Sequence, residues 1–100
     1  MREIAELLKT FSDETRLCIF VLLCRHGELC GCEVEGVLGL SQSAASRHLR
    51  HLYRAGLVDH RREGLWVFYA TRDPMAPDRK ALVDALALVL PTKEVDALDR

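Results

Sequence analysis

The sequence lacks any apolar run near the roughly 20 residues that a membrane-spanning helix needs, so we expect no membrane segment. Its first residues open an amphipathic pattern instead of the uninterrupted apolar stretch of a signal peptide, which predicts a cytoplasmic protein. Internal repeats, low-complexity tracts and linkers are also absent. A chain of 100 residues with 49% hydrophobic content therefore predicts a single domain over residues 1–100.

The middle of the sequence is almost without acidic residues. Between Ser41 and Arg62 the only acid is Asp59, among five arginines and three histidines: Arg47, Arg50, Arg54, Arg61, Arg62, His48, His51 and His60. The flanking segments 1–40 and 73–100 each carry more acidic than basic residues. The centre of the chain is therefore basic although the net charge of the whole chain is −1. Such a patch is typical of a surface that faces phosphate, although a solvated face has the same composition.

Apolar periodicity and turn residues predict a mainly α domain with one β-hairpin. The expected elements are helices over residues 4–11, 12–26, about 29 or 33 to 38, and 41–55, strands over 57–61 and 65–71, and a helix over 77–90. We expect Ser12 to cap the second helix and a Glu63-Gly64 turn to join the strands. The short connection at 39–41 indicates a helix-turn-helix, and the hairpin after it indicates a winged form of that motif.

The helix expected over residues 41–55 has two different faces. At about 100° per residue, its apolar positions fall together on the side expected to meet the core: Ala45, Leu49, Leu52 and Tyr53. The opposite side carries Ser43, Arg47, Arg50 and Arg54 within a wedge of about 40° and has no acid. Short polar side chains at the start of such a helix can reach base edges in the major groove, and arginines can contact guanine or phosphate.

The expected hairpin adds two arginines just before its turn, where a wing can follow the DNA backbone or minor groove. Trp66, Phe68 and Tyr69 in its second strand are more typical of side chains that pack a hairpin onto helices. The residues predicted to contact DNA are Ser41, Gln42, Ser43, Ser46, Arg47, His48, Arg50, Arg54, Arg61 and Arg62.

Several motifs in order, at matching spacing, give the whole chain a resemblance to a known family. They are Phe11-Ser12-Asp13-Glu14-Thr15-Arg16-Leu17, Gly27-Glu28-Leu29-Cys30-Gly31-Cys32-Glu33, Leu40-Ser41-Gln42-Ser43-Ala44-Ala45-Ser46-Arg47-His48-Leu49, Arg54-Ala55-Gly56-Leu57-Val58 and Arg61-Arg62-Glu63-Gly64-Leu65-Trp66-Val67-Phe68-Tyr69. On these residues the chain resembles the ArsR/SmtB family of metalloregulatory repressors. The resemblance implies a homodimer built from the first and last helices, which binds an imperfect palindrome in double-stranded DNA and is released by an inducer.

Four cysteines in a cytoplasmic chain are expected to be reduced thiols, so metal binding or redox sensing is favoured over a disulfide framework. Cys30 lies on the apolar stripe of its helix, where a cysteine is often a small core residue, whereas Cys32 lies off that stripe. The segment 28–33 resembles the arsenic-sensing form of the family's metal box. That resemblance implies As(III) or Sb(III) as inducer, held by Cys30, Cys32 and a third thiolate; soft thiolates select such ions.

The third ligand stays open, because Glu35 stands where the arsenic-sensing pattern has a further cysteine. Cys24 is the nearest candidate in the chain, although Cys18 and Cys24 both lie in an apolar segment and have the character of core residues. A small cellular thiol, or a site of two cysteines alone, are the alternatives. Residues 77–100 contain no histidine or cysteine, which sets aside the zinc site found on the last helix of other family members.

The spacing of Cys30 and Cys32 leads to a mechanistic hypothesis. Residues two apart on a helix point about 200° apart, so both thiols cannot reach one ion from an intact turn. Either the helix begins after Cys32, or ion capture unwinds its first turn at Gly31 and misplaces the DNA-reading helix.

Other functions remain open at this point. The same fold could sense cadmium or lead, or could sense oxidant or persulfide through its cysteines. A disulfide between Cys30 and Cys32 is expected to be strained, which favours Cys24 as the partner in oxidation. Inert cysteines in a plain helix-turn-helix protein are a further alternative. A thiol enzyme with His26 as its base is least favoured, because no substrate pocket or glycine-rich phosphate loop is evident.

Overall fold

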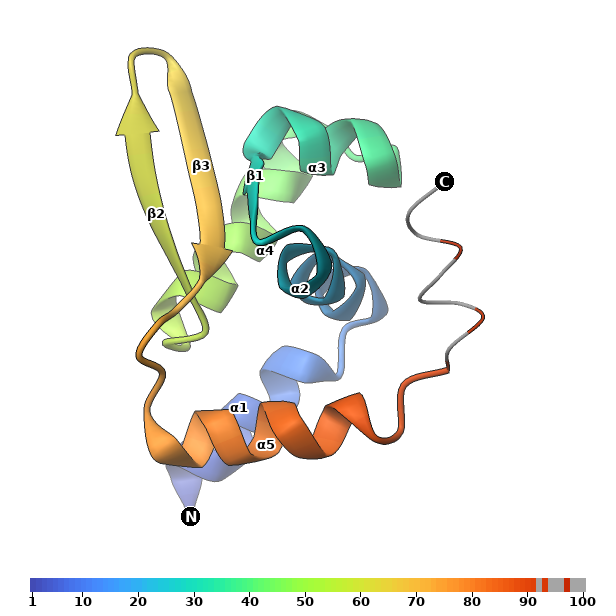
Figure 1. The fold of residues 1–100 in the computed structure, drawn as a ribbon, viewed down its shortest axis with the longest axis vertical. Helices are drawn as coiled ribbons and strands as arrows, with labels where there is room; N and C mark the ends of the chain where they lie inside the picture. Colours follow the sequence, from blue (N-terminus) through green and yellow to red (C-terminus); the bar gives the residue numbers. More distant parts are fainter. Residues whose placement is uncertain (92, 94–96, 98–100) are drawn as a thin grey trace.

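The computed structural model describes residues 1–91, 93 and 97, where the chain forms five named helices and a three-stranded antiparallel sheet (Figure 1). The elements are α1 (Arg2–Phe11), α2 (Glu14–His26), β1 (Glu28–Cys30), α3 (Gly31–Leu38), α4 (Gln42–Arg54), β2 (Val58–Glu63), β3 (Trp66–Thr71) and α5 (Pro77–Ala87). This order confirms the predicted winged helix-turn-helix, with α3 and α4 as the two helices of the motif and β2–β3 as the wing. Seven residues of the domain predicted over 1–100 lie outside the described residues.

The core is built around α2, which Figure 1 shows between the other helices and the hairpin. Its side chains from Ile19 to Leu23 are all buried, as the apolar run predicts. From α4 the core receives Ala45, Leu49 and Leu52, each at most 1% exposed, so the predicted inner face of that helix is confirmed. Tyr53 is the exception, because it is 39% exposed and packs against the ring of His60 on β2. Tyr53 of α4 therefore packs against the wing at the edge of the core.

The sheet contains one strand that periodicity did not predict. β1 pairs with β3 in antiparallel register, Cys30 opposite Phe68, and β3 lies between β1 and β2. A strand of three residues is too short to show an alternating pattern, and its pairing partner is about 40 residues away in sequence. The bounds of the hairpin strands also differ from the prediction. β2 continues to Glu63 and β3 begins at Trp66, so the turn is Gly64-Leu65 and not Glu63-Gly64.

The start of α2 corrects the predicted cap. Asp13, not Ser12, is the N-cap residue, and its carboxylate accepts a hydrogen bond of 2.9 Å from the backbone N–H of Arg16. The Ser12 hydroxyl instead donates to the carbonyl of Lys9 at the end of α1. Both residue types are good caps, and the one-residue difference arises because Ser12 still belongs to the C-terminal turn of the preceding helix.

We expect Asp13→Ala to lower the free energy of unfolding by about 0.5–2 kcal/mol at neutral pH, the usual effect of losing an N-cap. The hydrogen bond from Arg16 holds the pKa of the Asp13 carboxyl below its usual 3.8. A lowered folded-state pKa stabilises the protein above the unfolded value, and this contribution is lost as the pH falls through the folded pKa. Urea unfolding should show the deficit at pH 7 and a smaller one at acidic pH. Ser12→Ala is the matched control, and equal stability of both variants at pH 7 would contradict the assignment.

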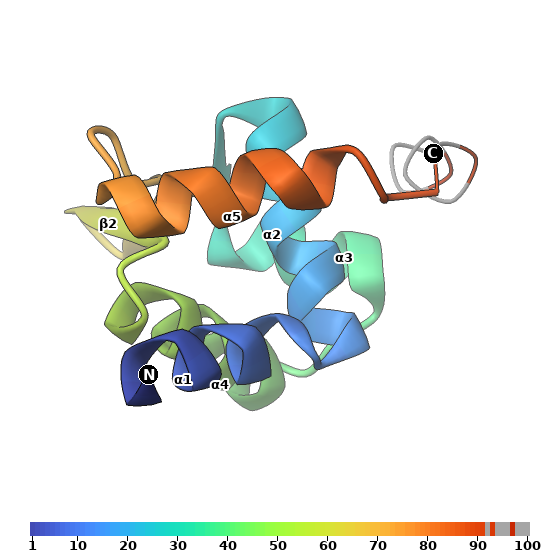
Figure 2. The ribbon, with the colours of Figure 1, turned by 90° about the horizontal axis from the view of Figure 1, so that it is seen from below.

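Helices α1 and α5 form the end of the molecule opposite the tip of the hairpin, and Figure 2 shows them from that end with α2 behind. Several large apolar side chains on this end and just after α5 are exposed, namely Met1, Ile4, Leu8, Leu88 and Val89. Leu82, Val83 and Leu86 of α5 pack against the core, yet no residue of that helix is fully buried. An apolar surface therefore remains uncovered at this end. Among the described residues, no helix is long and apolar enough to cross a membrane.

Candidate functional site

The polar N-terminal end of α4 is exposed, as a DNA-reading helix requires. Ser41 is its N-cap and accepts a hydrogen bond of 3.1 Å from the backbone N–H of Ala44. Gln42 and Ser43 are exposed and Ser46 is partly exposed. Arg47 follows one turn later and is also exposed, so these side chains present short polar groups and one guanidinium along one end of the helix.

His48 differs from the rest of the predicted DNA-contacting set. It is only 7% exposed, and its Nδ1 lies 3.4 Å from the guanidinium of Arg16 on α2, so the ring faces the interior. Burial lowers the pKa of His48, which favours the neutral ring that can accept from Arg16. His48 lies with Ala45 and Leu49 on the buried side of α4, so it is not among the proposed DNA contacts.

The arginines of α4 line a cleft against the first helix. Arg47, Arg50 and Arg54 are exposed, as predicted, and share a cavity of about 500 Å³ with Glu3 and Glu6 of α1. The carboxylates of α1 therefore lie along the same cleft as the guanidinium groups. This neighbourhood was not evident from the sequence, because it depends on how α1 crosses α4.

The two arginines of the wing have different surroundings. Arg61 binds the carboxylate of Glu28 on β1 through two hydrogen bonds of 2.7 and 3.0 Å, and also pairs with Glu63 at 3.2 Å. Its guanidinium lies over the ring of Phe68. Arg62, one residue further along the strand, points to the other face of the wing and is exposed. Two carboxylates thus offset the charge of Arg61, whereas Arg62 is the better placed to meet phosphate.

We expect Arg62→Ala to weaken DNA binding more than Arg61→Ala. The lost phosphate contact should reduce the slope of log affinity against log salt by about 0.9 for each subunit that binds the DNA. For Arg61→Ala the slope should change less, since its charge is already paired within the wing. Fluorescence anisotropy over a salt series measures both slopes. A larger loss for Arg61→Ala than for Arg62→Ala would show that Arg61 leaves its carboxylates to bind DNA.

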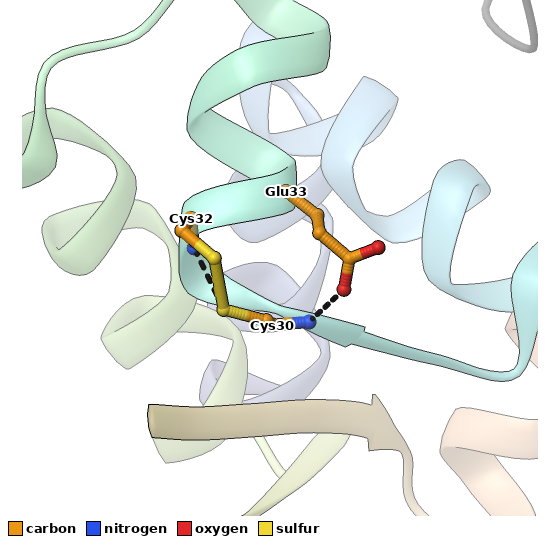
Figure 3. The surroundings of a disulfide bond; sticks show 3 residues. All are labelled: Cys30, Cys32 and Glu33. Atoms are coloured by element: carbon orange, nitrogen blue, oxygen red, sulfur yellow. Dashed lines mark hydrogen bonds between the residues drawn. A yellow bond between two sulfur atoms is a disulfide. The ribbon is translucent and has the colours of Figure 1, made fainter. Parts of the chain in front are cut away.

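Cys30 and Cys32 are joined by a disulfide at the start of α3 (Figure 3). Their Cα atoms are 5.3 Å apart. The structure thus pairs Cys30 with Cys32, whereas Cys24 was the expected partner in oxidation. The reason is local: Cys30 has an extended backbone and only Cys32 is within the helix, so the 200° separation of two helical residues does not apply.

Cys30 is also the N-cap of α3. Its Sγ lies 3.2 Å from the backbone N–H of Cys32, and its own N–H donates to Glu33 at 2.9 Å, a reciprocal arrangement of the capping-box kind (Figure 3). Because the helix begins at Gly31, the first predicted alternative, a start after Cys32, is wrong. Unwinding of the first turn on ion capture stays a prediction. Cys30 is the last residue of β1 and the cap of α3, so it connects the wing sheet directly to the helix-turn-helix.

A cavity of about 200 Å³ opens beside the cysteine pair. It is lined by Cys30 and Cys32, by Gln42 and Ser46 from the polar end of α4, and by residues of the hairpin that include Leu65 and Trp66. Cys30 is 5% exposed and Cys32 is exposed, so the pair borders the protein interior on one side and solvent on the other. The predicted metal ligands and two predicted DNA-contacting residues thus share one cavity.

The remaining cysteines are placed differently. Cys24 is exposed at the end of α2, and desolvation raises the pKa of its thiol, which disfavours the thiolate that binds metal. Cys18 is partly buried. The described residues contain no group of three histidine, cysteine or acidic side chains that could hold a metal ion, so Cys24 is not assembled with Cys30 and Cys32.

Comparison with known proteins gives the family. Residues 13–60 match the family model described as bacterial regulatory protein, arsR family. The chain is 42% identical over 82 residues to an uncharacterized HTH-type transcriptional regulator of Methanocaldococcus jannaschii, covering 82% of this chain and 92% of that one. The chain belongs to the ArsR family. Within it, the arsenic resistance transcriptional regulator ArsR1 of Pseudomonas putida is 42% identical over 89 residues, 86% of this chain and 66% of the relative.

Solved structures of regulators have the same fold. Reduced HlyU of Vibrio cholerae matches with a TM-score of 0.73 at 37% identity, covering 90% of this chain and 92% of that one. A winged helix-turn-helix domain from Mycobacterium bovis, described as homodimeric, matches with a TM-score of 0.73 at 28% identity, over 88% of this chain and 78% of that one. Family and fold are those of DNA-binding transcription regulators and not of enzymes, and the chain is a repressor of the ArsR type.

Proposed function

We propose that this ArsR-family protein represses transcription in the cytoplasm and leaves its operator when As(III) or Sb(III) binds the thiolates of Cys30 and Cys32. The observation that carries the proposal is the shared cavity, in which the two sulfurs border Gln42 and Ser46 of α4. The arsenic resistance regulator of P. putida supports the same inducer. Cadmium and lead are thiophilic alternatives that a competition titration separates.

The proposed DNA surface consists of the exposed end of α4 and the wing. Gln42, Ser43, Ser46 and Arg47 would read base edges, while Ser41, Arg50, Arg54 and Arg62 would contact phosphate. Arg61 would support the wing through Glu28 and contribute less to DNA affinity. A protein with one such helix per subunit binds a palindrome when two subunits are related by a twofold axis.

A homodimer would cover the apolar end of the molecule. α1 and α5 both lie at that end, and exposed apolar residues there include Ile4 and Leu8 of α1 and Val89 just after α5. The homodimeric M. bovis domain supports this arrangement. Burying these side chains in a symmetric interface would stabilise a chain of this size and fix the spacing of the two reading helices.

Coupling between the thiols and DNA would run through the position of Cys30. We propose that an ion bound by both sulfurs would weaken the cap that Cys30 gives α3 and would shift the strand end that pairs with Phe68. α3 and the wing both hold α4, so the DNA-bound arrangement and the ion-bound arrangement would differ in free energy, as allosteric release requires.

A second trigger is favoured by one observation, the disulfide between Cys30 and Cys32. Reversible oxidation of the pair would release DNA without any metal, with two electrons passing to an oxidant and two protons lost from the thiols. Mass spectrometry of the released protein distinguishes the triggers, because oxidation removes two hydrogens and ion capture adds the mass of arsenic.

The test of the proposed function is anisotropy with a duplex selected from random sequence by the reduced protein. Arsenite, antimonite, cadmium and an oxidant are added separately. We expect arsenite or antimonite to release the DNA at the lowest concentration. Release by oxidant alone would support the second trigger, and release by none of them would refute both.

A further inference from the structure

The larger of the two cavities described above lies on the side of α4 that faces α1, away from the thiol pair. Its volume of about 500 Å³ is within the range of about 300–1,000 Å³ typical of small-molecule sites. Gln42 and Ser46 line the smaller cavity on the wing side, whereas Arg47, Arg50 and Arg54 line this one. The two cavities therefore flank the DNA-reading helix on different sides. We call the larger one the α1–α4 cavity.

Basic side chains from three helices converge on the α1–α4 cavity. They are Arg2 of α1, Arg47, Arg50, His51 and Arg54 of α4, and Arg79 of α5. In the part of the chain that the structure describes, Arg79 pairs with Asp78, and the other four arginines form no ion pair. A concave surface with several unpaired guanidinium groups attracts anions and concentrates them.

Two of these basic side chains are held in place by hydrogen bonds. Arg79 donates through Nε to the carbonyl of Ala55 at 2.8 Å and through Nη1 to the carboxylate of Asp78 at 2.9 Å. The Nε2 of His51 lies 3.1 Å from Oγ1 of Thr10, whose hydroxyl donates to a backbone carbonyl of α1. Side chains that are already fixed lose less conformational entropy when a ligand binds, so this wall is preorganised.

The carboxylates in the lining indicate what kind of anion fits. Glu3 and Glu6 of α1 line the cavity with the arginines, and Glu6 also pairs with Lys9 at 3.6 Å. The sugar-phosphate backbone of DNA carries no hydrogen-bond donor, so these carboxylates would repel it without any compensating contact. A carboxylate accepts hydrogen bonds from the hydroxyl groups of a small molecule. The lining therefore matches a ligand with a phosphate group and free hydroxyls better than it matches a DNA strand.

The α1–α4 cavity and the apolar end of the molecule use different sides of α1. At about 100° per residue, the exposed Ile4 and Leu8 lie about 100–160° around the helix from Glu3 and Glu6. A homodimer formed through Ile4 and Leu8 would leave the cavity side of α1 open to a ligand.

On these grounds we propose that the α1–α4 cavity binds a small phosphorylated metabolite with free hydroxyl groups, of the sugar phosphate class, and that this ligand competes with DNA. Guanidinium groups hold phosphate through paired, charge-assisted hydrogen bonds, and Glu3 accepts from the hydroxyls. Arg50 and Arg54 are proposed phosphate contacts of the DNA surface, so the ligand and DNA cannot use them together. This site is separate from Cys30 and Cys32, and release through it needs neither metal nor oxidation.

Calorimetric titration of the reduced protein without DNA tests the site directly, with ribose 5-phosphate and inorganic phosphate as probes at constant ionic strength. We expect saturable binding of one ribose 5-phosphate per subunit, tighter than that of inorganic phosphate. Arg79→Gln and Arg2→Gln should each weaken it about tenfold or more, because each loses a charge-assisted hydrogen bond. Arg2 is exposed in the first turn of α1, so its variant tests the site even if Arg79→Gln fails to fold. Lys80→Gln, which removes a neighbouring charge outside the cavity lining, is the matched control.

Glu3→Ala separates recognition of the hydroxyls from general attraction of anions. This variant should bind ribose 5-phosphate less tightly, because it lacks the acceptor for the hydroxyls. It should bind inorganic phosphate at least as tightly as the wild type does, because a repelling charge is gone. Equal affinity of the wild type for both probes would overturn the assignment to sugar phosphates.

Anisotropy with the selected duplex tests the competition. At ten times its dissociation constant, ribose 5-phosphate should weaken DNA binding by about tenfold for each bound subunit. Ionic strength is held constant, because DNA affinity itself depends on salt. The Cys30→Ser, Cys32→Ser variant should respond to the same extent, which distinguishes this site from the proposed thiol trigger. Arg2→Gln should bind DNA as the wild type does and lose the response at that concentration.

Arg62→Ala is the reciprocal control, because Arg62 belongs to the proposed DNA surface and lies outside the cavity lining. It should bind DNA less tightly and bind ribose 5-phosphate as the wild type does. The proposal is overturned if ribose 5-phosphate does not bind, or if it binds and leaves DNA affinity unchanged. It is also overturned if Arg62→Ala and Lys80→Gln weaken ribose 5-phosphate binding as much as Arg2→Gln does, since any loss of positive charge would then suffice.

Discussion

The double variant Cys30→Ser, Cys32→Ser is expected to bind operator DNA with the affinity of the wild type and to lose its response to arsenite. Serine is a preferred N-cap residue, so its hydroxyl can replace the Cys30 sulfur in accepting from the N–H of residue 32. α3 should therefore keep its start, and the helix-turn-helix its geometry. The variant lacks the two soft thiolates that would bind arsenic.

The size of the lost response follows from the coupling between the two sites. Allosteric coupling free energies are commonly about 1–3 kcal/mol, which corresponds to about 5- to 150-fold in DNA affinity. Anisotropy titrations of wild type and variant, each with and without arsenite, measure it. Cys24→Ser is the matched control and should respond as the wild type does. A variant that still releases DNA with arsenite would place the inducer site elsewhere.

Arg47→Ala is expected to weaken binding to the selected duplex by about 1–3 kcal/mol and to relax the base preference at one position. Arg47 is exposed on α4 just after Ser46, so its removal should not affect folding. Arg54→Ala, at the C-terminal end of the same helix, is the informative comparison. It should weaken binding to all sequences similarly and reduce the salt slope by about 0.9 for each bound subunit.

Binding-site selection repeated with each variant separates the two roles. The Arg47→Ala protein should recover a degenerate position in each half-site, and the Arg54→Ala protein should recover the wild-type sequence. If both variants select the wild-type sequence, the reading of bases by Arg47 is wrong, and α4 contacts DNA through its serines and Gln42.

Most of the fold was predictable because it follows from local signals. The buried face of α4, with Ala45, Leu49 and Leu52, repeats at helical spacing, and Ser41 caps that helix as its sequence indicates. Tyr53 was expected to face the core and is 39% exposed, since helical periodicity does not say where the core ends.

The parts of the site that the sequence did not predict depend on contacts between distant segments. Glu28 meets Arg61 only because β1 pairs with β3, and β1 itself is too short for periodicity to detect. The surroundings of Cys30 could not be predicted from the sequence either. Its spacing from the apolar residues of α3 is that of a core position on a helix, whereas in the structure Cys30 ends β1 and caps α3. For His48 the sequence suggested a contact that the structure does not support. Its position in a basic segment predicted a DNA contact, whereas its ring is buried and packs against Arg16.

The most direct test of the account follows one protein sample through a full cycle of inducer binding and removal. Reduced wild-type protein on its selected duplex is measured by anisotropy, arsenite is added, and excess dithiol then removes the arsenic, while mass spectrometry records the arsenic bound at each step. The account predicts that DNA affinity falls when one arsenic is bound to the segment containing Cys30 and Cys32, and returns when it is removed. Unchanged DNA affinity with arsenic bound to that segment would contradict it.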